Sequence, residues 1–308
     1  MSSRATRLAR SYLFAPGSHE RLLEKVFGAG ADAVVIDLED AVAPEHKTLA
    51  RQQVSAVLTA RGRVAGGPLV FVRINGVQSG LWRDDLDAVV CAGLDGVRVA
   101  RTESPEELAE VDAELSRLER ARDFESGTLS IIPSIESAAG VHGAARIATG
   151  PRVRALAFGS TDFLRDIGGA PGPDDHETLH ARSHLVLVSR MAAIQPPIMS
   201  VFTRLVDLDG LRISSDAGRR LGFFGRSCIH PSQVPIVHQV FTPSSAGLTE
   251  ARMVVAAADS PENRGGQVLT LPDGQLVDRV VVLRARAILD LNAALEREPG
   301  AQGSEDQG

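Results

Sequence analysis

Lysine is almost absent from this sequence of 308 residues, since only Lys25 and Lys47 occur among its 33 basic residues. Cysteine is equally scarce: Cys91 and Cys228 stand alone, without metal-ligand spacing. This scarcity argues against a zinc site or a disulfide framework and favours a reduced, cytoplasmic protein. No apolar run approaches the roughly 18–20 residues that span a bilayer. The apolar stretch after the arginine-containing start is too short for a signal peptide.

Charge of one sign is not concentrated anywhere either. The net charge is −6, and no block of like charge stands out. We therefore expect neither nucleic acid nor a membrane surface as a partner.

The chain does contain eight short, mostly apolar runs separated by longer helix-like segments. Near-continuous apolar runs are typical of parallel strands that are buried on both faces. One intervening segment, 104–122, opens with Ser-Pro-Glu-Glu, which indicates a capped helix. This alternation predicts a (β/α)₈ TIM barrel. The expected strands are 11–16, 33–38, 69–74, 96–100, 129–135, 153–159, 197–201 and 226–229.

The alternative fold is a doubly wound open sheet, which usually carries a glycine-rich phosphate loop after its first strand. Here the first strand runs into Pro-Gly-Ser, which is no such loop. We expect residues 1–245 to form the catalytic barrel and 246–295 a short C-terminal helical extension that packs on a neighbouring subunit. Residues 296–308 are polar and glycine-rich, and we expect a disordered tail.

Acids and arginines gather where the expected strands end, which is the edge that carries the active site of a TIM barrel. Glu136 and Asp162 follow consecutive strands. Two carboxylates with arginines nearby suit Mg²⁺, which takes oxygen ligands and keeps positions for water and substrate. Helix capping is the competing explanation. The other strand-end residues are Asp37, Glu39, Asp40, Arg73, Asn75, Arg101, Ser160, Thr161 and His230.

The scarcity of lysine also limits the chemistry. A Schiff-base aldolase needs a lysine that lines the barrel, but Lys25 lies on the first expected helix and Lys47 lies well past the second strand. No Gly-x-Ser-x-Gly elbow is present, and Cys228 has no evident base. A metal Lewis acid, with arginines that hold an oxyanion, is the chemistry that remains.

Six motifs in order resemble the citrate lyase β-subunit-like proteins of the HpcH/HpaI aldolase superfamily, from about residue 10 to residue 245. The resemblance implies a TIM barrel that makes or breaks carbon–carbon bonds next to an acyl thioester, with Mg²⁺. The motifs are YLFAPGSHERLLEKVFGAGADAVVIDLEDAVAPEHK at 12–47, VRIN at 72–75, IPSIES at 132–137, FGSTDFLRDIG at 158–168, ARSHLVLVSR at 181–190 and GFFGRSCIHPSQV at 222–234.

The resemblance also implies roles for individual residues. It places the metal ligands on Glu136 and Asp162 and the active-site arginine, which would stabilise an oxyanion, on Arg73. The acidic strand-two motif corresponds to Asp37, Glu39 and Asp40, of which Asp37 is a candidate catalytic residue. Coenzyme A binding is implied for Pro16, Gly17, Ser18 and Lys47.

The match weakens in three places. Asp278 corresponds to an acid/base Asp that relatives receive from a neighbouring subunit, but the Lys, Met and Pro around it are missing here. The fourth strand ends in Ala100-Arg101 where relatives often have Pro-Lys. The seventh has Met199 where many have Asp, which we expect to remove a polar group near the pocket.

The expected function is Mg²⁺-dependent cleavage or formation of a β-hydroxyacyl thioester such as malyl-, citramalyl- or citryl-CoA. The products of cleavage would be a 2-oxo acid and a shorter acyl thioester. Three alternatives stay open: a thioesterase for the same esters, a citryl-carrier-protein lyase subunit acting on an acyl-carrier protein, and a non-catalytic acyl-CoA binder. The resemblance further implies a homo-oligomer, with a trimer as the family's expected form.

Overall fold

The computed structural model describes residues 7–172, 174–260, 268–270, 274 and 276–296. The chain divides into two compact units, Met1–Phe241 and Thr242–Gly308. Of the tail expected at 296–308, only Glu296 falls within the described residues, as the last residue of a helix, and the rest lies outside them.

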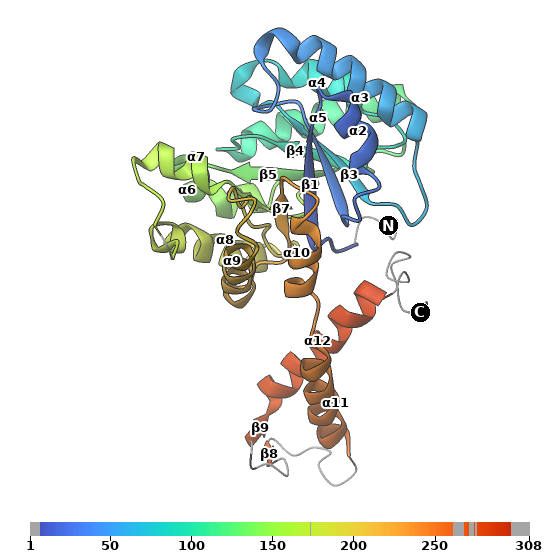
Figure 1. The fold of residues 1–308 in the computed structure, drawn as a ribbon. Coiled ribbons are helices and arrows are strands. Elements are labelled where there is room, and N and C mark those ends of the chain that lie inside the picture. The colour runs from blue at the N-terminus through green and yellow to red at the C-terminus, as the bar shows by residue number, and fades with distance from the viewer. Residues whose placement is uncertain (1–6, 173, 261–267, 271–273, 275, 297–308) are drawn as a thin grey trace. The chain divides into compact units, whose positions relative to one another are not determined.

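The first unit is built on a sheet of seven parallel strands in the order β6-β5-β4-β3-β2-β1-β7 (Figure 1). Consecutive parallel strands need crossover connections, and helices supply them. The strands are β1 (Ser11–Pro16), β2 (Ala33–Asp37), β3 (Leu69–Ile74), β4 (Gly96–Val99), β5 (Ser130–Ile135), β6 (Ala157–Phe158) and β7 (Arg226–Cys228).

The sheet is strongly curled. Strands β4 and β7 are four places apart in it, a separation of roughly 19 Å in a flat sheet. Nevertheless, Nη1 of Arg98 on β4 donates a hydrogen bond to Oγ of Ser227 on β7 at 2.9 Å. The inner faces of these two strands therefore look at each other across the interior of the curl.

The expected strand 197–201 is present only as isolated bridges. Ile198 bridges to Ala157 and Met199 to Arg226, so this segment lies between β6 and β7. Two consecutive prolines, Pro196 and Pro197, have no N–H to donate, which limits the ladder here. The α/β class with a parallel sheet is thus confirmed, as a curled sheet of seven strands.

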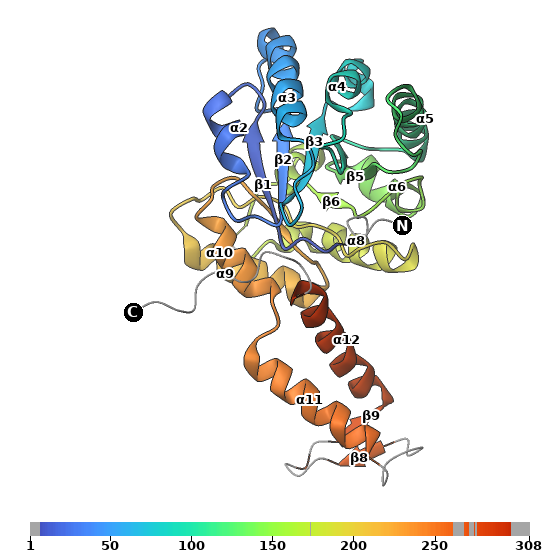
Figure 2. The ribbon, with the colours of Figure 1, turned by 90° about the vertical axis from the view of Figure 1, so that its right-hand side faces the viewer.

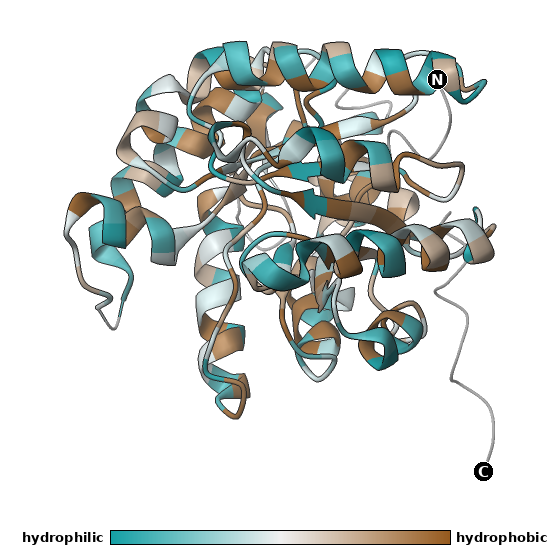
Figure 3. Cartoon of the chain, turned by 90° about the horizontal axis from the view of Figure 1, so that it is seen from above, coloured by the Kyte–Doolittle hydropathy of each residue, from teal (hydrophilic) through white to brown (hydrophobic). Residues whose placement is uncertain are grey.

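Nine helices of the described first unit surround the sheet (Figure 2). Most of them carry both polar and apolar residues, as the colours of Figure 3 show. They bury apolar stripes against the outer face of the strands. The helices are α2 (Glu20–Val26), α3 (Lys47–Arg61), α4 (Trp82–Val89), α5 (Pro105–Ala121), α6 (Ala138–Ala148), α7 (Ser160–Ile167), α8 (Leu179–Met191), α9 (Leu208–Leu221) and α10 (Gln233–Phe241).

Helix α5 begins as its sequence predicts. The hydroxyl of Ser104 accepts a hydrogen bond from the N–H of Glu107, and the Glu107 carboxylate accepts one from the N–H of Ser104. Pro105 occupies the first turn. This capping box satisfies donors that a helix start otherwise leaves unpaired.

Side chains alternate strictly between the two faces of the curled sheet. On β2, Val34 and Ile36 belong to the core beneath the helices, whereas Ala33 and Val35 belong to a second apolar cluster on the inner face. That inner cluster also holds Tyr12, Phe71 and Ile132. Beyond it, toward the strand ends, the inner positions become polar, and this change creates the site described below.

The second unit contains two helices and a short hairpin. The helices are α11 (Ser245–Asp259) and α12 (Arg279–Glu296), and the antiparallel strands are β8 (Val268–Thr270) and β9 (Leu276–Asp278). A small apolar cluster that includes Ala251, Val254, Val277 and Ala285 holds it together. Across the described part of the chain, no helix combines the length and apolarity that crossing a bilayer demands.

Candidate active site

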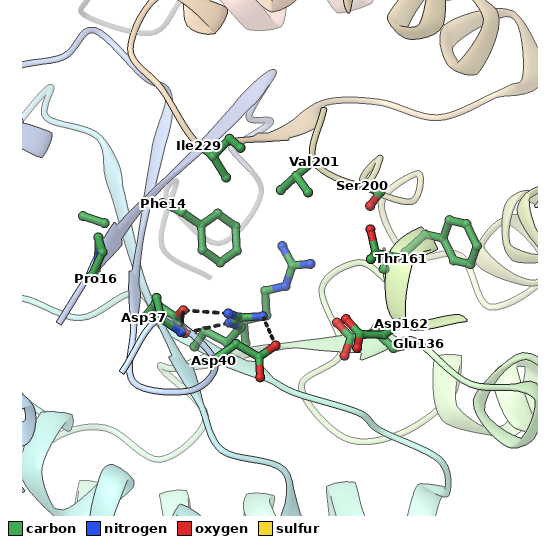
Figure 4. Close-up of a pocket in the computed structure, with 16 residues that line it drawn as sticks. Phe14, Pro16, Asp37, Asp40, Glu136, Thr161, Asp162, Ser200, Val201 and Ile229 are labelled. Carbon is green, nitrogen blue, oxygen red and sulfur yellow. Dashed lines mark hydrogen bonds and ion pairs between the residues drawn. The ribbon is translucent and has the colours of Figure 1, made fainter. Parts of the chain in front are cut away.

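A cavity of about 440 Å³ opens at the carboxyl ends of the strands. Its lining follows the two-residue period of the strands, because every second side chain of a strand points inward. The strands and their first following residues supply Phe14, Pro16, Asp37, Arg73, Arg98, Glu136, Phe158, Gly159, Ser200 and Ile229. Ala15, Asp40, Ala41, Thr161, Asp162 and Val201 complete the lining (Figure 4).

Asp37 and Arg73 form a two-bonded ion pair at one end of this cavity (Figure 4). The Arg73 guanidinium donates from Nε to Oδ1 at 2.7 Å and from Nη2 to Oδ2 at 2.6 Å. The same carboxylate accepts hydrogen bonds from the N–H groups of Glu39 and Ala41 at 2.9 and 3.0 Å. Four donors around one buried carboxylate fix the orientation of the guanidinium.

Burial and charge oppose each other in this pair. Burial alone would raise the pKa of Asp37, but its hydrogen bonds and the charge of Arg73 outweigh burial and hold the pKa below its usual value. Likewise, burial would lower the pKa of Arg73, yet Asp37 and Glu39 raise it. Both groups are therefore ionised at neutral pH, and Asp37 is a poor base that serves to position Arg73.

Glu39 is a second carboxylate beside Arg73, with Nη1 and Oε2 3.0 Å apart. Burial raises the pKa of Glu39 to about 7, with further upward contributions from Asp40 and Asp37 that the charge of Arg73 only partly offsets. Asp40 lies at the rim, with 66% of its side chain exposed. Glu39 therefore changes protonation near neutral pH.

Lys47 holds the loop that carries these acids. Its ammonium donates to the carbonyls of Leu38 and Glu39 at 2.7 Å each and to Oδ1 of Asn75 at 2.9 Å. An ammonium has three protons, and these acceptors use all of them. The structure thus gives Lys47 and Asn75 a supporting position behind the cavity.

The loop after β1 approaches this support closely. The N–H of Gly17 donates to the carbonyl of Asp37 at 2.8 Å. A methyl group at Gly17 would lie 2.8 Å from the same carbonyl oxygen, so only glycine fits. Pro16 lines the cavity, whereas Ser18 is half-buried and does not line it.

Glu136 and Asp162 stand at the other end of the cavity (Figure 4). Glu136 is only 4% exposed, and among the described residues no cation lies within ion-pair distance of its carboxylate. Burial raises the pKa of Glu136; the charges of Arg98 and Arg73 offset that rise only in part, and those of Asp162 and Asp40 add to it. Asp162 pairs with Arg165 one helical turn on, at 2.8 Å.

This arrangement fits a hard divalent cation. A buried carboxylate without an ion-pair partner is costly unless a cation binds beside it. In the part of the chain that the structure describes, no group of three or more His, Cys, Asp or Glu side chains is arranged around a metal position. Two carboxylates and room for water match Mg²⁺, which uses few protein ligands, and do not match a zinc site.

Helix α7 places Asp162 within its first turn. The turn is tied to segment 197–201, because the N–H and the hydroxyl of Ser160 both bond to Oγ of Ser200, at 3.1 and 3.0 Å. Gly159, just before the helix, packs against the side chain of Glu136. Ser160 therefore anchors the helix, while Thr161 and Asp162 line the cavity.

Arg98 lies in the middle of β4 and lines the cavity. It is not among the residues that the sequence analysis selected at the strand ends. The strand register could have identified it, because Arg98 lies beside Arg73 of β3 in the sheet, and Arg73 lies beside Asp37 of β2. Parallel neighbours in register face the same side of a sheet. A charged residue inside a fully buried four-residue strand is itself unusual.

Two expectations, for Arg101 and Met199, are corrected. Arg101 is exposed with a left-handed φ of 49° and does not line the cavity, so the second cavity arginine is Arg98. Met199 faces outward, because a methyl group at Gly218 on α9 would lie 2.2 Å from its Sδ atom. His230 is exposed and bonds to Ser232 at 2.7 Å, as expected of a turn residue rather than a ligand. In the second unit, the Asp278 carboxylate accepts a hydrogen bond from the N–H of Val281 at 2.9 Å and caps α12.

The fold and the cavity define a parallel α/β protein with a carboxylate pair and an arginine pair at the carboxyl edge of its sheet. More specifically, the chain belongs to the HpcH/HpaI aldolase/citrate lyase family, which matches residues 10–231. The family predicted from the motifs is thereby confirmed.

Individual relatives extend this similarity over nearly the whole chain. The chain is 36% identical to a citrate lyase subunit beta-like protein of Deinococcus radiodurans, over 93% of this chain and 98% of that protein. It is 33% identical to a (3S)-malyl-CoA thioesterase of Cereibacter sphaeroides, over 91% and 93%. It is also similar to the structure of CitE from Mycobacterium tuberculosis in complex with magnesium, acetoacetate and coenzyme A. That comparison has a TM-score of 0.75 at 27% identity and covers 94% of this chain and 99% of CitE.

Proposed function

We propose that this protein is a Mg²⁺-dependent carbon–carbon lyase that cleaves, or forms, a β-hydroxyacyl-CoA ester of the malyl, citramalyl or citryl type. The observation that carries the proposal is the buried Glu136 carboxylate, which has no cation partner among the described residues and opens onto the same cavity as Asp162. Membership of the aldolase/citrate lyase family and the similarity to a magnesium- and coenzyme A-bound CitE support the same function.

Glu136 and Asp162 would hold the cation, since they are the two carboxylates at that end of the cavity. When bound there, Mg²⁺ would polarise the oxygens of the substrate's hydroxyl and adjacent carboxylate. The Arg165 side chain lies one turn further along α7 and forms an ion pair with Asp162, which restrains the Asp162 carboxylate.

Cleavage transfers the proton of the substrate hydroxyl to a water molecule in the cavity, turns the C–O bond into a carbonyl, breaks the carbon–carbon bond and moves its electron pair to the thioester as an enolate, which is then protonated. Arg73 would stabilise the negative oxygen that develops, because its charge is permanent and its orientation is fixed by Asp37. Asp37 thereby acts as a positioning residue. We propose Asp278 of a neighbouring subunit as proton donor to the enolate carbon.

We further propose that segment 197–201 completes an eight-stranded barrel, which the bridges of Ile198 and Met199 to strands on either side support. Residues 1–245 would then be the catalytic domain and 246–295 an extension that packs on another subunit of a homo-oligomer, with a trimer as the family's form. A cytoplasmic location is in keeping with the two free cysteines.

Coenzyme A would enter beside Pro16, Gly17 and Ser18, whose loop borders the cavity through Pro16. Lys47 would contribute by holding the neighbouring loop in place.

Hydrolysis of the same esters is the second candidate, favoured by the 33% identity to a (3S)-malyl-CoA thioesterase. Water would then release free coenzyme A and the intact hydroxy acid. The two activities consume one substrate and differ only in their products.

A product-resolved assay with Mg²⁺ tests the proposal. Malyl-, citramalyl- and citryl-CoA are offered to the wild type, and chromatography identifies what is released. A 2-oxo acid with a shortened acyl-CoA supports the lyase, whereas free coenzyme A with the hydroxy acid supports the thioesterase. Turnover of none of the esters contradicts both.

The variant Asp162→Asn should lower turnover by at least about 100-fold, because charge and positioning of the cation are lost together. Asp209→Asn is a matched control, since Asp209 also lies in the first turn of a helix and pairs with an arginine three residues on, at 3.0 Å. The control should keep wild-type turnover. An active Asp162→Asn protein with unchanged Mg²⁺ binding would refute the metal assignment.

A further inference from the structure

Arg98 presents a cation at the floor of the cavity. Its side chain starts on β4 and reaches across the curled sheet, with Nε donating to Ser134 at 2.8 Å and Nη1 to Ser227 at 2.9 Å. These two hydroxyls belong to β5 and β7, so the guanidinium is held from both sides of the interior. Its remaining amino group, Nη2, has no hydrogen bond to the described residues and faces the cavity that Arg98 lines.

No carboxylate of the described residues neutralises Arg98 by an ion pair. Arg73, in contrast, is paired with both Asp37 and Glu39. Glu136 acts on Arg98 only at longer range, and its charge is the one that a divalent cation would neutralise. Burial lowers the pKa of Arg98 to about 10, so the group stays charged at neutral pH. A buried guanidinium without a counter-charge predicts an anionic ligand.

The position of Arg98 indicates which part of a substrate would meet it. Asp40 and Asp162 form the outer part of the lining, with 66% and 29% of their side chains exposed, whereas Arg98 is 4% exposed. The proposed function places coenzyme A at the loop of Pro16, Gly17 and Ser18, of which only Pro16 lines the cavity. The acyl group therefore enters with its thioester outward and its far end toward Arg98.

We propose that Arg98 binds the carboxylate at the end of the acyl group farthest from the thioester, and that it selects β-hydroxyacyl-CoA esters carrying such a carboxylate. This inference rests on the proposed function, because it names the substrate class of the same cavity. Arg98 offers Nη2 to one carboxylate oxygen, while the serines keep the guanidinium plane in place. An ester with a methyl group in place of that carboxylate leaves the charge of Arg98 unpaired and is rejected.

Arg226 provides a matched control for the substitution of a buried arginine. It lies on β7, is also 4% exposed, and bonds to two serines, Ser214 and Ser215, at 3.2 and 3.0 Å. It faces helix α9 on the other side of the strand wall and does not line the cavity. Substitutions at Arg98 and Arg226 should thus disturb the sheet similarly but differ in their effect on ligands.

The first experiment is calorimetric titration of the Mg²⁺-loaded protein with pyruvate and with its neutral methyl ester. Arg98→Gln should weaken pyruvate binding by about 10- to 100-fold, the range for a hydrogen bond to a charged group. It should not weaken binding of methyl pyruvate. Arg226→Gln should bind both as the wild type does. Mn²⁺ titration followed by electron paramagnetic resonance should give all three proteins the same metal affinity.

If Arg98→Gln does not fold, the same titration with Arg98→Lys tests the inference. Lysine keeps the charge and loses the planar fork, so pyruvate binding should fall by less than in a neutral variant but by at least about threefold. Unchanged pyruvate affinity in either variant overturns the inference, and so does an equal loss for pyruvate and its methyl ester.

Turnover separates this inference from the proposed function. In a wild type that cleaves malyl-CoA, the ratio of kcat/KM for malyl-CoA over 3-hydroxybutyryl-CoA should fall at least about tenfold in Arg98→Gln and at least about threefold in Arg98→Lys. If the wild type cleaves no ester, the proposed function fails, and the pyruvate titration still tests Arg98 as a carboxylate site.

Discussion

Gly159 lies so close to Glu136 that a methyl group at its Cα would be 2.5 Å from Cγ of Glu136 and 2.8 Å from Oε1. The φ of Gly159 is −113°, so its backbone does not itself require glycine. What requires glycine is the carboxylate side chain packed against it. The position of one proposed metal ligand thus depends on the absence of a side chain directly after the next strand.

Gly159→Ala should therefore displace Glu136 without unfolding the protein, because the clash is with a side chain that can rotate. We expect Mn²⁺ affinity to fall roughly 10- to 100-fold, as for other changes that misplace a metal ligand. Calorimetric titration measures the affinity. Gly28→Ala, whose added methyl group would meet nothing nearer than 3.8 Å, should bind Mn²⁺ as the wild type does.

Glu39 gives the stability of the protein a specific dependence on pH. Its pKa is raised from 4.5 to about 7, so the folded state binds the proton more tightly than the unfolded state. Stability from this group is complete below its unfolded pKa and is lost as pH rises through about 7. Relative to Glu39→Gln, the wild type should lose free energy of unfolding between pH 4.5 and 7. Urea unfolding at several pH values measures the difference, and a constant difference would contradict the shift.

Lys47→Met should destabilise the loop after β2. Removing the ammonium leaves the carbonyls of Leu38 and Glu39 and the amide oxygen of Asn75 without their donor. We expect the free energy of unfolding to fall by about 1–3 kcal/mol. KM should rise equally for coenzyme A and pantetheine esters, because Lys47 acts through the loop. A rise for the coenzyme A ester alone would instead indicate direct contact with its nucleotide. Lys25→Met, at an exposed position on α2, should change neither quantity.

Substitution of Met199 should affect the stability of the protein, whereas substitution of Ser200 should affect its turnover. Met199 packs in the outer core against α9, so Met199→Ala should cost about 2–5 kcal/mol of unfolding free energy. Its ratio of kcat/KM for malyl-CoA over citramalyl-CoA should stay that of the wild type. Ser200→Ala removes the hydroxyl that anchors Ser160 and lines the cavity, and it should reduce turnover. A changed substrate ratio in Met199→Ala would place its side chain at the site.

The sequence predicted the strands well where the apolar run is long and uninterrupted. The expected strand 11–16 matches β1 residue for residue, and 69–74 matches β3. At 197–201 only isolated bridges form, because the adjacent prolines before them have no N–H to donate to a ladder. The expected strand 153–159 shortens to Ala157–Phe158 with a separate bridge at Val153. Propensity identifies extended chain, but a ladder also needs a partner in register.

The site was predicted only in part because strand ends do not reveal which way a side chain points. Glu136, Asp162, Asp37 and Arg73 all line the cavity. Arg101 also follows the end of its strand in the sequence, but its left-handed backbone conformation places it at the surface. The register pairs Arg73 with Arg98, which selects Arg98 in place of Arg101. It also pairs Met199 with Arg226, whose side chain faces α9, so Met199 faces outward as well. The period of two therefore carries more information about this site than the strand end does.

Phe14 is the shared wall of the two cavity arginines. The carbon at the centre of the Arg73 guanidinium lies 5.3 Å from the ring centroid, and that of Arg98 lies 5.1 Å from it. A single aromatic ring thus attracts two like charges at once. A substitution of Phe14 therefore changes the surroundings of both arginines together. In sequences related to this one, a change of Phe14 should be accompanied by changes at both arginine positions, so the three residues should vary as a single unit.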